Sequence, residues 1–134
     1  MSTTSTTNPR SLAGGGSWGF VATAIAVLTG IAAGVIHFSL VTDEFNKGAT
    51  GYGTAFILTG VATFAGLIAG YVPLAALAPL RTVARVALIL LSIGSIVAYL
   101  VLGYFDTLGW ITKAIETFFV LGVAATIAVD AKSS

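Results

Sequence analysis

Four long apolar segments divide this chain of 134 residues, and each is long enough to cross a lipid bilayer as a helix. About 30 Å of hydrocarbon takes roughly 20 helical residues to cross. We expect spans at about 18–41, 51–72, 86–104 and 110–129. Charged residues make up 8% of the chain, whereas soluble domains carry about 25%. The sequence therefore predicts an all-α fold, a bundle of four antiparallel transmembrane helices.

The rest of the chain is short and polar. Residues 1–17 are rich in Ser, Thr and Gly, a composition that buries too little apolar surface to order itself, so we expect a flexible tail. A signal peptide is the alternative, but the apolar run after Arg10 is longer than the usual 7 to 15 residues. We therefore expect an uncleaved first span, one membrane domain over residues 18–129 and a C-terminal tail over 130–134.

The basic residues predict an orientation, because cytoplasmic loops carry an excess of Lys and Arg. If both termini are cytoplasmic, four basic residues lie inside and two outside. The inner four are Arg10, Arg81, Arg85 and Lys132, and the outer two are Lys47 and Lys113. The sequence thus favours an N-in, C-in protein, which we expect in a prokaryotic cytoplasmic membrane. Arg81 and Arg85 share a helical face and are expected to anchor to anionic lipid headgroups.

Composition also argues against several classes of function. The net charge of +1 leaves no basic surface for nucleic acid. With no cysteine, the chain can form neither a disulfide nor a thiolate metal site. The sequence has no phosphate-binding loop, no nucleophile elbow and no zinc-protease motif. An enzyme is therefore disfavoured, and the sequence leaves the question of a cofactor open.

Small residues recur every four positions in the first two spans, as they do where membrane helices pack closely. They are Ala22, Ala26, Gly30 and Gly34 in the first span and Ala62, Gly66 and Gly70 in the second. We expect these stripes to pack within one bundle rather than to form a dimer interface.

Three ionisable residues lie inside predicted spans, where they are costly and usually face protein or water. His37 shares the small-residue face of the first span, and Lys113 and Glu116 lie near the start of the fourth. Their depths match that of Tyr99, which shares a face of the third span with Ser92 and Ser95. The sequence therefore predicts an intramembrane polar cluster of His37, Tyr99, Lys113 and Glu116.

Two interpretations of this cluster remain open. In the first it only fixes helix register through hydrogen bonds and ion pairs. In the second His37 and Glu116 form a proton relay, a polar ligand pocket or half of a metal site, with Asp43 and Glu44 contributing from the first outer loop. A dedicated metal site is not expected, because one histidine and one carboxylate fall short of three or four protein ligands.

The chain resembles a class of small prokaryotic four-span membrane proteins. The resemblance rests on His37 followed by the acidic stretch 42–45, on Gly53 with Phe56, and on Gly109 with Lys113 and Glu116. Members of this class tend to have a proline and a second histidine where this chain has Thr42 and Glu44. That difference argues against a two-histidine metal role here, and the resemblance implies no particular activity.

We expect the protein to be an accessory or structural subunit, in a homo-oligomer or with other membrane subunits, surrounded by lipid. The alternative is a minimal transporter or channel in which an oligomer lines a path with His37 and Glu116. Intramembrane polar residues concentrate in the outer half of the predicted bundle, which favours the subunit over the transporter.

Overall fold

The computed structural model describes residues 13–103 and 105–133, and this part of the chain is built from helices. The α-helices are α1 (Ala13–Asn46), α2 (Thr50–Tyr71), α3 (Arg81–Leu102) and α4 (Thr107–Ser133), and a 3₁₀ helix, η2 (Ala75–Leu80), leads into α3. All four α-helices are long and apolar enough to cross a membrane. The predicted all-α bundle of four membrane-spanning helices is confirmed, and its orientation across the membrane stays a prediction.

The helices extend beyond the expected spans. Helix α1 has 34 residues, a length of about 50 Å at 1.5 Å per residue. It includes residues 13–17 of the expected tail and, at its other end, Asp43 and Glu44, which lie in the last helical turns rather than in a loop. Helix α3 begins at Arg81 rather than at 86, and α4 continues through most of the expected C-terminal tail. The remainder of the expected N-terminal tail, residues 1–12, lies outside the described residues.

Each connection contains a residue that ends or starts a helix. Pro73 cannot continue α2, and Val72 before it is extended, with φ −73° and ψ 128°. Gly48 and Gly103 have φ of 76° and 72°, a left-handed conformation in which a Cβ is strained. Asp106 caps α4, since its Oδ1 accepts a hydrogen bond of 2.6 Å from the Gly109 N–H.

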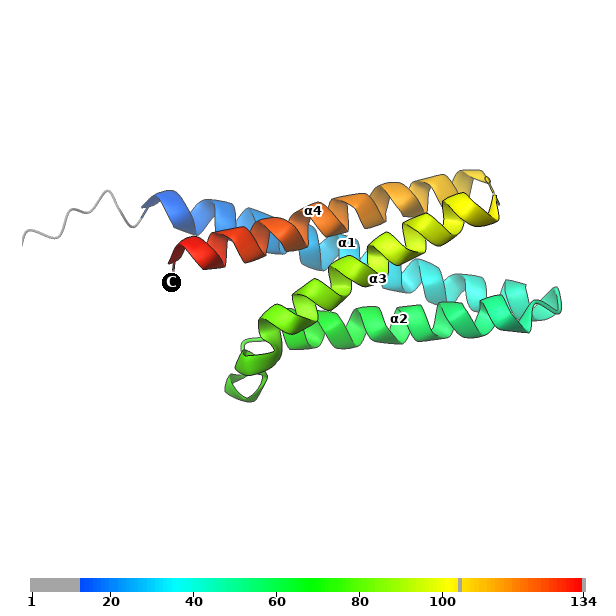
Figure 1. The fold of residues 1–134 in the computed structure, drawn as a ribbon, viewed down its shortest axis with the longest axis horizontal. Coiled ribbons are helices and arrows are strands. Elements are labelled where there is room, and N and C mark those ends of the chain that lie inside the picture. The colour runs from blue at the N-terminus through cyan, green and yellow to red at the C-terminus, as the bar shows by residue number, and fades with distance from the viewer. Residues whose placement is uncertain (1–12, 104, 134) are drawn as a thin grey trace, which may run out of the picture.

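The helices form a ring in which each contacts two others (Figure 1). Helices α1 and α3 each pack on α2 and α4, and in the described part of the chain neither diagonal pair is in backbone contact. Helix α1 crosses from α4 to α2, whereas α3 crosses from α2 to α4 (Figure 1). The start of α1, the end of α4 and η2 lie at the same end of the bundle, which we call the α2–α3 end after the connection that it contains (Figure 1). The connections between α1 and α2 and between α3 and α4 lie at the opposite end, which we call the α3–α4 end (Figure 1).

Small residues make the close helix contacts. The α1 stripe is buried, and a Cβ on Gly30 would lie 2.7 Å from Phe119 of α4 and 2.9 Å from Leu67 of α2. The prediction that this stripe packs within the bundle is therefore confirmed. In α2, Gly66 and Gly70 contact α3, whereas Ala62 is exposed.

Candidate functional site

Five polar residues from three helices meet toward the α3–α4 end of the bundle. We call them the histidine–glutamate cluster: His37 of α1, Ser95 and Tyr99 of α3, and Lys113 and Glu116 of α4. The antiparallel packing brings the second half of α1, the second half of α3 and the start of α4 to the same level. His37 and Glu116 are 4% and 2% exposed. The four residues singled out from the sequence thus lie together, and Ser95 joins them.

Glu116 is at the centre of this cluster. Its Oε1 accepts a hydrogen bond of 2.9 Å from Ser95 Oγ, and its Oε2 accepts one of 2.7 Å from Lys113 Nζ. Lys113 also donates to Ser95 Oγ at 2.7 Å and lies 5.6 Å from the centre of the Tyr99 ring. Because bonds to charged groups are short and strong, this network ties α3 to α4 inside the bundle.

His37 is held in one orientation by its own helix. Its Nδ1 lies 2.7 Å from the Ala33 carbonyl oxygen, and because a carbonyl only accepts, Nδ1 must carry a proton. The other ring nitrogen, Nε2, then faces Glu116 Oε1 at 3.5 Å. A proton on Nε2 or on the carboxyl makes this contact attractive, whereas without it two lone pairs face each other. The imidazole and the carboxylate therefore face each other where α1 packs on α4.

The two acids expected to assist from an outer loop do not join this cluster. Glu44 forms an ion pair of 3.2 Å with Lys47 at the end of α1, and Asp43 is exposed. Among the residues that the structure describes, no three His, Asp or Glu side chains lie close enough together to hold a metal ion.

A second polar group, the arginine cluster, lies toward the α2–α3 end. Its members are Gly70 and Tyr71 of α2, Arg85 of α3, and Thr126 and Asp130 of α4. Arg85 Nε donates to the Gly70 carbonyl at 3.0 Å, and its Nη1 donates to Asp130 Oδ2 at 2.5 Å. The guanidinium also lies 4.8 Å from the centre of the Tyr71 ring, and the Tyr71 hydroxyl is 3.0 Å from Thr126 Oγ1.

The arginine cluster differs from the sequence-based expectation for Arg85. Arg81 and Arg85 were expected to face lipid headgroups together, but Arg85 is 8% exposed and is bonded to two other helices. The physical reason is that the Asp130 carboxylate and the Gly70 carbonyl offer it partners inside the bundle. The role of Arg81 as a headgroup anchor stays a prediction.

The role of Asp130 as the partner of Arg85 was not predicted from the sequence, because Asp130 was expected to lie in a C-terminal tail. One signal was available, because Asp130 and Arg85 carry opposite charges near the same ends of two predicted antiparallel neighbours. Asp130 also lies one helical turn after Thr126, on one face of α4.

An apolar layer separates the two polar clusters. It consists of one or two buried residues from each helix: Ala26, Leu67, Leu88, Phe119 and Val123. Glu116 and Asp130 lie about 21 Å apart along α4, at 1.5 Å per residue. In the part of the chain that the structure describes, every buried polar side-chain atom has a hydrogen-bond partner. The clusters are therefore two internally satisfied sites and not the ends of one polar path.

Comparison of the chain with protein-family models, with curated proteins and with solved structures gave no match. The four apolar helices define a small multi-pass membrane protein. Its resemblance to small prokaryotic four-span proteins stays a prediction.

Proposed function

We propose that the protein is a structural or accessory membrane subunit, acting as a homo-oligomer or within a larger membrane complex. The observation that carries the proposal is the apolar layer between the two clusters, because it leaves a single bundle without an aqueous route. Leu88, Phe119 and Val123 in this layer are each at most 2% exposed. A solute would have to displace these packed side chains, so a structural role accounts for the interior better than transport does.

Helix α3 is the best candidate for the contact with another subunit. Each candidate span contains an apolar stretch of 18 residues. In the span that contains α3, 17% of this stretch is buried inside the bundle, against 28% in each of the other three spans. Its exposed face carries large residues at alternating spacings of three and four: Val83, Val86, Leu90, Ile93, Val97 and Leu100. This is the spacing of the seam at which paired helices interlock their side chains. Van der Waals packing of such a seam drives association where lipid removes the hydrophobic effect.

Disulfide cross-linking tests this proposal, since the chain contains no cysteine. Leu90→Cys places one thiol on the α3 seam, and Leu58→Cys places one on α2 at the same exposure of 64%. In oxidised native membranes we expect a cross-linked dimer from Leu90→Cys and monomer from Leu58→Cys. Mass analysis of the wild-type protein in mild detergent then shows whether copies or other proteins accompany it.

Two results would contradict the proposal. A wild-type protein that is monomeric and free of other proteins in mild detergent, with no cross-link through Leu90→Cys, would show that α3 faces only lipid. Equal cross-linking through Leu90→Cys and Leu58→Cys would show random collisions instead of a seam.

A second candidate function is binding of a proton, or of a small polar ligand, at the histidine–glutamate cluster within a minimal transporter or channel. One observation favours it, namely that His37 Nε2 and Glu116 Oε1 face each other at 3.5 Å with Nδ1 already committed to Ala33. A transporter would then need a path formed between copies, because the interior of one bundle is closed by the apolar layer.

Infrared spectroscopy over a pH series tests this second candidate. If the pair shares a proton, the carboxyl band of the wild type should disappear in Glu116→Gln and shift in His37→Gln. Glu44→Gln is the matched control, because Glu44 pairs with Lys47 outside the cluster. A band that is the same in the wild type and in His37→Gln would exclude a shared proton.

A further inference from the structure

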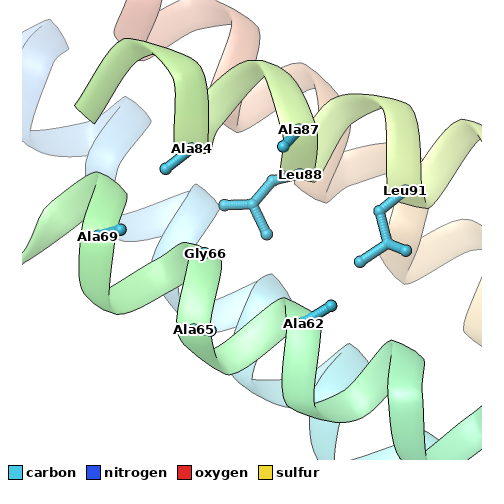
Figure 2. Close-up of a pocket in the computed structure, with 8 residues that line it drawn as sticks. All are labelled: Ala62, Ala65, Gly66, Ala69, Ala84, Ala87, Leu88 and Leu91. Carbon is cyan, nitrogen blue, oxygen red and sulfur yellow. The ribbon is translucent and has the colours of Figure 1, made fainter. Parts of the chain in front are cut away.

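An open apolar groove lies between α2 and α3. Its volume is about 450 Å³, and its lining residues are Ala62, Ala65, Gly66, Ala69, Ala84, Ala87, Leu88 and Leu91. Figure 2 shows Leu88 of α3 pointing toward Gly66 of α2, with Ala84 and Ala69 on one side of this contact and Leu91 and Ala62 on the other. The residues that line the groove are uncharged, and most are smaller than leucine.

The crossing of the helices explains why the groove is open. Helices α2 and α3 touch where a Cβ on Gly66 would lie 2.6 Å from Leu88, and α3 then leaves α2 to reach α4 (Figure 1). The alanine side chains beside this contact are too short to bridge the widening gap. In a bilayer, an apolar molecule or segment must therefore fill it.

One end of the groove carries a free cation. Arg81 lies seven residues before Leu88 and three before Ala84, so it is on the same side of α3, at the α2–α3 end of the bundle. Side chains in a helix lean toward its N-terminus, which directs Arg81 away from the hydrocarbon. Within the described residues Arg81 has no hydrogen bond, ion pair or ring contact, in contrast to Arg85.

The charges of the chain indicate what covers the groove. Of its five acidic residues, only Asp130 lies at the α2–α3 end, and it is bonded to Arg85. Among the described residues, a second copy in the same orientation would thus bring to Arg81 no acidic side chain other than Asp130, which Arg85 already holds. Leu88 also occupies the floor of the groove, which keeps the backbone of another helix from the close approach that small residues otherwise allow. A flexible acyl chain needs no such approach, and its headgroup phosphate supplies the missing negative charge.

We propose that the α2–α3 groove binds one acyl chain of an anionic phospholipid whose phosphate pairs with Arg81. The proposal is independent of the subunit role, because the seam on α3 lies on a different face of that helix from Ala84, Ala87 and Leu91.

Native mass spectrometry of the full chain in detergent tests the proposal, with phosphatidylglycerol and phosphatidylcholine of identical acyl chains as probes. We expect tighter binding of phosphatidylglycerol. Arg81→Gln should weaken it about fivefold, the effect of one basic residue at an anionic membrane surface. Lys132→Gln removes the same charge from an exposed position at the end of α4 and is the matched control. Binding of phosphatidylcholine, whose choline cation offsets its phosphate, should change less than that of phosphatidylglycerol in Arg81→Gln and should not change in Lys132→Gln.

Filling the groove tests the acyl-chain half of the proposal. Ala65→Leu places a larger side chain in the groove and should weaken binding of both lipids, whereas Ala55→Leu changes an exposed alanine of α2 outside it. Arg81→Gln tests the contact with the headgroup, and Ala65→Leu tests the contact with the acyl chain. If one of these variants fails to fold, the other still tests the proposal.

Four results would overturn the proposal. The wild type could bind the two lipids equally, or Arg81→Gln and Lys132→Gln could have equal effects, which would show only diffuse attraction. Ala65→Leu could behave as Ala55→Leu does, which would leave the groove without a lipid. Finally, the wild type could be a dimer that Ala65→Leu dissociates, which would show that a second copy fills the groove.

Discussion

Two cations with little exposure, Lys113 and Arg85, lie toward opposite ends of the bundle, and each is bonded to a carboxylate. Lys113 pairs with Glu116, which is 2% exposed, whereas the Asp130 side chain that pairs with Arg85 is 61% exposed. Loss of either carboxylate leaves a largely buried cation without its counter-charge, since the side chains of Lys113 and Arg85 are 12% and 9% exposed. Loss of Glu116 and loss of Asp130 should therefore both destabilise the protein.

The first prediction is that His37 and Glu116 are energetically coupled. A double-mutant cycle with His37→Gln and Glu116→Gln should show non-additivity of about 0.5 to 3 kcal/mol in the free energy of unfolding, the range for residues in contact. Unfolding in mild detergent titrated with a denaturing detergent provides the measurement. Strict additivity would mean that the 3.5 Å contact contributes nothing.

The second prediction concerns Arg85. Arg85→Gln should lower the free energy of unfolding by about 1 to 3 kcal/mol, because it removes hydrogen bonds between charged groups and leaves the Gly70 carbonyl with a weaker donor. Arg81→Gln, measured in the same detergent, should change it by less than about 0.5 kcal/mol, as surface substitutions usually do. Equal losses in the two variants would indicate that both arginines act through the lipid surface.

At the scale of helices, glycines decide which faces meet. Helix α1 presents Gly30 and Gly34 to bulky residues of its neighbours, and α2 presents Gly53 and Gly60 to Phe45 and Phe38 of α1. Each glycine accepts a large side chain from the facing helix. Because helices in lipid associate by close van der Waals contact, these positions control the packing.

The third prediction follows from these contacts. Gly30→Leu and Gly66→Leu should each lower stability by about 1 to 3 kcal/mol, the usual cost of overpacking. Gly94→Leu is the matched control, because a Cβ on exposed Gly94 meets nothing within 4 Å. Leu58→Ala, on an exposed face of α2, should also be tolerated. Thermal denaturation in detergent gives the comparison, and full tolerance of Gly30→Leu would show that α1 does not pack as described.

At the scale of the whole molecule, an even number of crossings puts the start of α1 and the end of α4 on one side of the membrane (Figure 1). The imbalance of basic residues predicts that this side is cytoplasmic. The histidine–glutamate cluster would then lie in the outer leaflet and the arginine cluster in the inner one.

The fourth prediction tests this orientation. Single cysteines replace Lys47, between α1 and α2, and Ala76 in η2, both exposed. An impermeant thiol reagent added to intact cells should label Lys47→Cys and leave Ala76→Cys unlabelled until the membrane is opened. The reverse pattern would place the histidine–glutamate cluster in the cytoplasmic leaflet.

The sequence by itself determined the four helices, their approximate ends and the face on which His37 lies. These features depend on local properties, namely the length of an apolar run, the helical period and residues such as Pro73 that stop a helix. It also placed His37 and Glu116 at one depth in antiparallel helices, as members of one candidate polar cluster, and left open whether the two side chains touch. Their functional role stays a prediction.

Only the tertiary structure decided which partner each polar group takes. The crossing of α3 from α2 to α4 turns Arg85 toward Gly70 and Asp130 and opens the groove beside Leu88. Helical period fixes the direction of a side chain only relative to its own axis, whereas its partner depends on the angle and separation of a second helix. Those quantities follow from the packing of glycines against bulky residues across the whole bundle, which no single segment of the sequence contains.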